Sequence, residues 1–207
     1  MEEIPNDIEP LREVTTIAAG NAATALSKLI GQDVDVVVPS VKLVAIEKVT
    51  QEVGDTAHVS SAALVKIQGD IQGVLLFTLD PLDAEAVATG TIRTQIRGDY
   101  VDQDQSVLKE MVNIVAGAAL SAISKFLDLK LRPSVPDSTT DMLGAVLDPF
   151  MAEFGTQYEQ VLILQEVFTL PHEAQSLKML AVIDPPSTTK LLEQLTLKLD
   201  AGHAANN

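Results

Sequence analysis

The sequence predicts an α+β fold: a tandem duplication with pseudo-two-fold symmetry, a largely antiparallel sheet, and two long equivalent helices on one surface. An internal repeat, apolar strands joined by short turns, and a long amphipathic segment at the start of each repeat indicate this fold. The chain has 207 residues, 46 % of them apolar, which is enough to bury a sizeable core. We expect a single domain over residues 1–207, with two repeats at about 8–100 and 101–200 that share one core.

Internal similarity is the most informative feature of the chain. Residues 11–39 align with residues 108–136 without a gap. The matched pairs include Glu13 with Glu110, Gly20 with Gly117, Ser27 with Ser124, and Pro39 with Pro136. Further along each half, LLFTLDP at 75–81 is similar to MLAVIDP at 179–185. Both of these segments are apolar runs that end in Asp-Pro, which is typical of a buried strand entering a turn or a helix.

The first repeat is predicted to run helix, strands, hairpin and helix. Its first helix spans 10–30, because Pro10 is tolerated in a first turn. Strands are expected at 34–38 and 41–49 around Pro39, and at 58–67 and 73–79 across the Gly69-Asp70 turn, before a helix from Leu82 to Ala88.

The second repeat is predicted to follow the same order after a break at Arg97-Gly98-Asp99. Asp102 or Asp104 caps a long helix that runs to about Leu127. Strands are expected at 159–170 and 177–183, and Ser187 is expected to cap a last amphipathic helix that ends at Leu199.

Each long helix should bury one face and display a polar stripe beside it. A helical wheel places the core face of the second helix at Val107, Leu108, Met111, Val115, Ala118, Ala122 and Phe126, and that of the first at Leu11, Val14, Ala18 and Leu29. The stripes contain Ser106, Glu110, Asn113, Gly117, Ser121 and Ser124 on one helix, and Glu9, Glu13, Thr16, Gly20, Thr24 and Ser27 on the other. Most such stripes are simply solvated surface. Small residues following the carboxylate in both repeats favour contact with another protein instead.

Composition excludes several classes of function. The net charge of −15 repels phosphate backbones and acidic lipids, which argues against nucleic-acid binding and against membrane association. There are no cysteines, so disulfides and thiolate metal sites are excluded, and His58, His172 and His203 do not favour a histidine-built zinc site. The acidic N-terminus lacks signal-peptide character, and no uninterrupted apolar run reaches the length of a membrane span. We therefore expect a cytoplasmic protein without membrane insertion. The Asp-Pro pairs at Asp80 and Asp184 are interpreted as strand ends rather than as catalytic carboxylates.

The spacing Ser106-x3-Glu110-x2-Asn113-x22-Pro136 resembles the signature of the CheC/CheX/FliY family of bacterial and archaeal chemotaxis. The segment AAGNAATALSKLIGQDVDVVVP is similar to the first helix of the CheC branch of that family. The resemblance covers both repeats, and the length leaves no room for the extra switch domain of the FliY branch.

The resemblance implies a phosphatase of CheY-P, the phosphorylated response regulator of a two-component signalling pathway. In such a site the glutamate pairs with a lysine of the regulator, and the asparagine orients the attacking water. The regulator supplies the Mg²⁺, so no cofactor or metal of the chain's own is expected. Matched by position, Glu110 and Asn113 form the complete catalytic site.

The first helix departs from this pattern. Glu13 and Pro39 are present, but Thr16 stands at the asparagine position and Glu9 at the helix start, so the first site is degenerate. A hydroxyl is shorter than an amide and does not offer the same donor and acceptor pair. The resemblance also implies an alternative, non-catalytic function as an adaptor that binds and regulates the receptor deamidase CheD. A third alternative is a structural component of the flagellar or archaellar switch.

Overall fold

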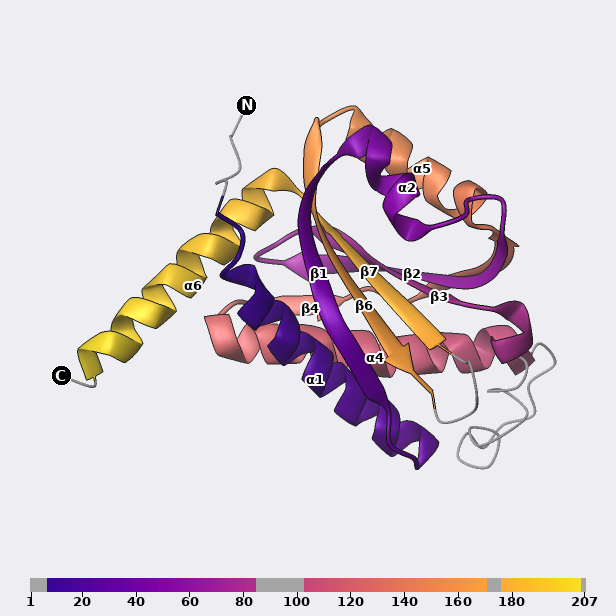
Figure 1. Cartoon of the computed structure of the whole chain (residues 1–207), viewed down its shortest axis with the longest axis horizontal. Coiled ribbons are helices and arrows are strands. Elements are labelled where there is room, and N and C mark those ends of the chain that lie inside the picture. Colours follow the sequence, from indigo (N-terminus) through magenta and orange to yellow (C-terminus); the bar gives the residue numbers. More distant parts are fainter. Residues whose placement is uncertain (1–6, 85–102, 171–175, 206–207) are drawn as a thin grey trace.

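The computed structural model describes residues 7–84, 103–170 and 176–205 (Figure 1). The first half of the chain contains α1 (Leu11–Ile30), β1 (Asp35–Ala45), the 3₁₀ turn η1 (Ile46–Lys48), α2 (Val49–Val53), β2 (Val59–Gly69) and β3 (Gly73–Leu79). The second half contains α4 (Gln103–Leu127), β4 (Leu131–Pro133), β5 (Asp137–Met142), α5 (Leu143–Gly155), β6 (Gln160–Thr169), β7 (Ser176–Ile183) and α6 (Pro185–Ala205).

One sheet runs through both halves, and all of its strand pairs are antiparallel. The strand order is β1-β6-β7-β3-β2-β4, and β5 also pairs with β2. This order is symmetric: β3 and β7 pair at the centre, and the first strand of each half pairs with the hairpin of the other half. The predicted fold class, a pseudo-symmetric α+β duplication with a largely antiparallel sheet, is thereby confirmed.

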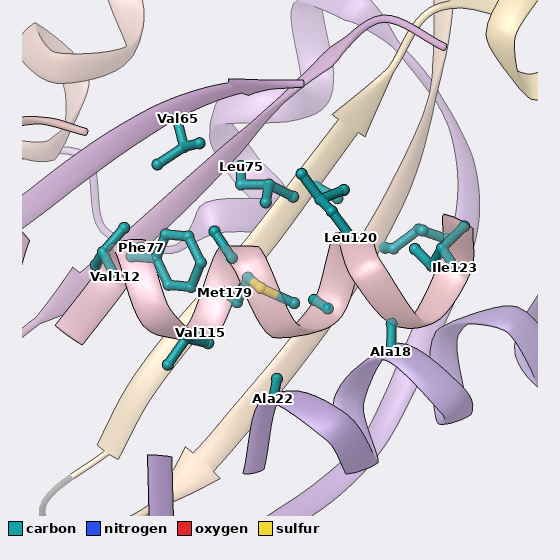
Figure 2. Close-up of a cluster of buried hydrophobic side chains, with 14 of the residues drawn as sticks. Ala18, Ala22, Val65, Leu75, Phe77, Val112, Val115, Leu120, Ile123 and Met179 are labelled. Atoms are coloured by element: carbon teal, nitrogen blue, oxygen red, sulfur yellow. The ribbon is translucent and has the colours of Figure 1, made fainter. Parts of the chain in front are cut away.

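Helices cover both faces of the sheet. The helices α1 and α4 pack against each other on one face, and α2 and α5 lie on the other (Figure 1). The central strand β3 is buried along its whole length because it is covered from both sides. Its side chains alternate: Leu75 and Phe77 enter the core below α1 and α4, shown in Figure 2, whereas Val74 and Leu76 enter the core below α2 and α5.

Several predicted boundaries were wrong, each for a local reason. The strand expected to run to Val49 ends at Ala45, and the chain then turns helical through η1 and α2. The two strands expected on either side of Pro39 are one strand, β1, whose register with β6 shifts between Val37 and Ser40. Proline has no N–H to donate to the ladder, so the strand accommodates it as an irregularity rather than ending there.

The cap of the last helix is Asp184, and not Ser187 as predicted. The Ser187 backbone N–H donates to Asp184 Oδ1 at 2.7 Å, as in a helix N-cap. The Ser187 hydroxyl oxygen accepts a bond from the Gln72 N–H at 2.7 Å and so ties α6 to the turn between β2 and β3. The strands and helix between 131 and 155 were not predicted at all. Of the helix expected at 82–88, residues 82–84 are helical as predicted. Residues 85–88, Asp102, the break at 97–99 and His172 lie outside the described residues, and of the Asp104 side chain nothing is described.

Within the described part of the chain, one helical stretch, Ser106–Leu127, is long and apolar enough to span a membrane by length and composition. This stretch is the body of α4, which packs against α1 and the sheet. Its apolar side chains, Val112 and Val115 among them, fill the main core. The hydropathy of α4 is therefore accounted for by core packing.

Candidate functional site

The polar stripe of α4 presents Glu110 and Asn113 to solvent. They are three residues apart and so lie next to each other on the helix surface, while Met111 and Val112 between them are buried and fix the orientation of that surface. Among the residues that the structure describes, none forms a hydrogen bond or an ion pair with either side chain. A free carboxylate and a free amide therefore stand side by side, available to a partner.

The corresponding surface of α1 presents Glu13 and Thr16, both exposed. The Thr16 hydroxyl donates a hydrogen bond of 2.8 Å to the Arg12 carbonyl oxygen of its own helix. Its single hydrogen is thereby used within the helix, and only acceptor capacity is left. One turn earlier, Arg12 Nε forms an ion pair of 2.8 Å with Glu9 Oε1. The first surface therefore retains its carboxylate but lacks a free group that can both donate and accept.

Glycines continue both stripes. Gly20 follows Thr16 and Gly117 follows Asn113, each one turn further along its helix. A Cβ built on either glycine would have no heavy atom within 4 Å, the chain neighbours and the helix's own backbone apart. Nothing inside the protein therefore requires glycine at these two positions, although glycine costs a helix roughly 1 kcal/mol relative to alanine. A requirement from outside the molecule, close approach of a partner, would explain both.

The serines that end the two stripes have a structural task. The Ser27 hydroxyl oxygen accepts a bond from the Val34 N–H at 3.0 Å, and Ser124 Oγ accepts one from the Leu131 N–H at 3.1 Å. Each serine thus joins the end of its long helix to the strand that follows. Both lie on the predicted stripe, but their hydroxyls bind the chain itself. The part of each stripe that faces a partner is the turn that carries the carboxylate and the small residues just after it.

Comparison with known proteins shows the family to which a chain with these two helix surfaces belongs. The family model described as the CheC-like family matches residues 11–43 and 104–139, which contain α1, most of α4 and β1, all of β4 and the start of β5. A curated relative, the CheY-P phosphatase CheC of Bacillus subtilis (strain 168), is 30 % identical over 199 residues, covering 91 % of this chain and 93 % of the relative. The chain belongs to the CheC-like family.

Solved structures agree with the CheC-like fold. Thermotoga maritima FliY matches with a TM-score of 0.70 at 20 % identity, over 96 % of this chain and 100 % of that one. The Borrelia burgdorferi structure of a CheX-CheY-BeF₃-Mg²⁺ complex matches with a TM-score of 0.53 at 15 % identity, over 83 % and 96 % of the two chains. The FliM middle domain of Vibrio alginolyticus matches with a TM-score of 0.58 at 12 % identity, over 90 % and 99 %. At these identities the likeness concerns the fold.

Both CheC-like helix surfaces lie within the matched residues, and the two prolines of the signature follow them. Pro136 is buried between β4 and β5, and Pro39 lies where β1 shifts its register. Both prolines thus lie at an edge of the sheet, Pro39 within the irregular part of β1 and Pro136 between β4 and β5.

The Asp-Pro carboxylates are not part of these surfaces. Asp80 Oδ1 accepts a bond from the Leu82 N–H at 2.9 Å, as Asp184 does from Ser187, so both side chains hold a helix start. His58 Nε2 lies 3.4 Å from Asp80 Oδ2 and is exposed. Across the described residues, no group of three or more His, Asp or Glu side chains is placed to hold a metal ion.

Proposed function

We propose that this chain is a CheY-P phosphatase, a hydrolase that removes the phosphoryl group from the aspartyl-phosphate of a chemotaxis response regulator. The observation that carries the proposal is the pair of unengaged side chains, Glu110 and Asn113, on the exposed face of a helix that matches the CheC-like family. The curated relative, which is 30 % identical and aligns over 91 % of this chain and 93 % of its own length, is a CheY-P phosphatase. The CheX-CheY complex is a member of this fold with a response regulator bound.

The chemistry suits a protein with few reactive groups. Phosphoryl transfer depends on positioning and on charge stabilisation more than on covalent help from the enzyme. The Asn113 amide has a donor end and an acceptor end, so it can hold a water molecule at a fixed angle, in line with the phosphoryl-aspartate bond. The water adds to phosphorus as the bond to the aspartate oxygen breaks, which gives inorganic phosphate and the free carboxylate. The Mg²⁺ that offsets the phosphoryl charge belongs to the regulator.

Glu110 has a separate task in this proposal. Its carboxylate pairs with a lysine of the regulator and so fixes the regulator over Asn113. The overall charge of −15 fits a protein partner with a basic group at its active site and does not fit nucleic acid. This function is that of a cytoplasmic protein.

The test is the decay of phosphorylated CheY with and without the chain, repeated with Asn113→Ala. Loss of the aligned water should slow hydrolysis roughly a hundredfold, the scale of a misplaced reacting group. Because Asn113 is exposed, the variant should unfold at the wild-type temperature. Thr24→Ala, which changes an exposed side chain of the α1 stripe, is the matched control. Undiminished turnover in Asn113→Ala would remove Asn113 from the mechanism.

Binding of CheD, the adaptor alternative, stays a prediction and is separable from hydrolysis. If the chain binds CheD through another surface, Asn113→Ala should retain CheD in a pull-down while losing phosphatase activity. A chain that binds CheD but never accelerates the decay of CheY-P would be an adaptor only.

A further inference from the structure

The surface around Asn113 also contains a cation. Lys109 is exposed on α4, directly before Glu110 and four residues before Asn113. Residues four apart in a helix are neighbours on its surface. At about 100° per residue, Asn113 lies about 40° around the helix from Lys109 and about 60° from Glu110, in opposite directions. The Asn113 amide therefore has a carboxylate on one side and an ammonium group on the other.

The direction of the side chains brings these three groups together. Side chains of a helix lean toward its N-terminus, so the Asn113 side chain lies over the turn that contains Lys109 and Glu110. The ammonium group of Lys109 ends a long flexible stem, which lets it reach a wide area of that surface. A phosphoryl group held above Asn113 is within its reach.

The two halves of the chain treat the corresponding cation differently. The repeat alignment pairs Lys109 with Arg12, and the Nε atom of Arg12 forms the 2.8 Å ion pair with Glu9 described above. The residue that corresponds to Glu9 on α4 is Ser106, which has no charge to offer. None of the side chains that the structure describes forms an ion pair or a hydrogen bond with Lys109. The half that has the asparagine thus leaves its cation free, whereas the half that has threonine engages it.

The charge of the chain makes a free cation useful at this point. The net charge of −15 repels a phosphoryl group, which itself carries nearly two negative charges. We propose that Lys109 is a catalytic residue of the hydrolysis, whose ammonium group binds the phosphoryl oxygens of the aspartyl-phosphate while Asn113 holds the water. This inference rests on the proposed phosphatase function and adds a third residue to Glu110 and Asn113.

Lys109 acts by its charge in this proposal. In the transition state of phosphoryl transfer, negative charge is spread over the three equatorial oxygens of the transferred group, and a cation supplied by a partner protein can stabilise it. Water still adds to phosphorus and the aspartate carboxylate still leaves, so Lys109 changes the rate and not the products. Stabilisation that is made only in the transition state raises kcat, so its loss is expected in kcat.

The test compares Lys109→Met with the wild type, using the full chain and a saturating concentration of phosphorylated CheY. Methionine is as good a helix former as lysine, so the melting temperature should not change. The value of kcat should fall about 10- to 100-fold, the range for losing a hydrogen bond to a charged group. Lys109→Arg keeps the charge and should retain most of the activity. A wild-type kcat in Lys109→Met would overturn the proposal.

Lys125→Met is the matched control. Lys125 is the other basic residue of α4, it is also exposed, and it lies roughly 24 Å further along the helix at 1.5 Å per residue. The two variants lose the same charge from the same helix, but Lys125→Met should keep the wild-type kcat. An equal fall of kcat in both variants would indicate a general effect of charge and would overturn the role of Lys109.

The dependence on salt separates catalysis from attraction. A lysine that only attracts the regulator would affect kcat/KM, most strongly at low salt, and would leave kcat unchanged. That result for Lys109→Met would contradict the proposal. A lowered kcat at both low and high salt is the result expected of a catalytic residue.

The proposed function and the role of Lys109 fail in different ways. If the wild-type chain does not accelerate the decay of phosphorylated CheY, or if Asn113→Ala is fully active, the site is rejected and Lys109 with it. Slow turnover by Asn113→Ala together with full activity of Lys109→Met would reject Lys109 alone.

Discussion

Replacement of Gly117 should raise stability and lower activity at the same time. Gly117 lies in α4 one turn beyond Asn113, and a Cβ there would meet no heavy atom within 4 Å, its helix surroundings apart. Gly117→Ala therefore introduces no clash and removes the conformational cost of a helical glycine, about 0.8–1.0 kcal/mol. For a chain of this size each kcal/mol raises the melting temperature by about 2–4 °C. An increase of about 2–4 °C is expected.

The bulkier Gly117→Gln tests what the glycine is for. Glutamine is also a good helix former, so the variant should melt no lower than the wild type. Its side chain would extend into the space that a docked regulator occupies. Overpacking an interface costs about 1–3 kcal/mol, so kcat/KM for hydrolysis of phosphorylated CheY should fall about 5- to 150-fold.

The pseudo-symmetric glycine is the matched control for this experiment. Gly20→Gln makes the same change on α1, where the surface lacks the catalytic amide, so it should be as stable as Gly117→Gln but keep its activity. Equal activity of Gly117→Gln and wild type would refute docking over Gly117. A lower melting temperature of Gly117→Ala would refute the reasoning on stability.

Three further outcomes are expected. Glu110→Gln should weaken binding of the phosphorylated regulator and reduce its salt dependence, as measured by titration calorimetry; a shifted pH profile with normal binding would indicate acid-base catalysis instead. Thr16→Asn in an Asn113→Ala background should recover hydrolysis if α1 lacks only its amide, and failure to recover would show that its surface has lost more. Asp184→Ala should lower the free energy of unfolding by about 1–2 kcal/mol, measured in urea, because the Ser187 N–H loses its cap; an unchanged value would mean that the cap contributes nothing.

Regular apolar patterns made much of this fold predictable from sequence. The long helices have apolar positions at helical spacing, and the hairpin of β2 and β3 has a Gly-Asp turn between two apolar strands. The segment β5 reads DSTTDM, and nearly all of it is exposed. It is a strand because its backbone pairs with β2, and that long-range interaction leaves no mark on its composition. The helix α5 was missed because Pro149 lies inside it, although Leu143, Leu147 and Phe150 have the spacing of one helix face and are buried together.

The candidate site was predictable in part. The spacing of Glu110 and Asn113 was enough to select both residues, since it is repeated in the chain and resembles a known signature. Whether the threonine of the first helix is free was not predictable, because its bond to Arg12 depends on the rotamer. The burial of Glu166 was overlooked, although the sequence indicated it. Glu166 lies two residues from both Leu164 and Phe168, so it shares the face of β6 that these two residues turn toward the main core.

The exchange of edge strands has a consequence for biosynthesis. Among the described strands, β1 pairs with β6 alone, more than a hundred residues later in the chain, and one edge of β2 pairs with β4 and β5 of the second half. On the ribosome the first half therefore emerges with β1 unpaired, and its hydrogen-bonding edge stays open until nearly the whole chain has been made. Pairing at so large a sequence separation makes folding slow. An isolated first half would lack β6, so β1 of one copy would have to pair with a strand of another copy, and this pairing would depend on protein concentration. In the tandem chain the pairing is intramolecular and independent of protein concentration.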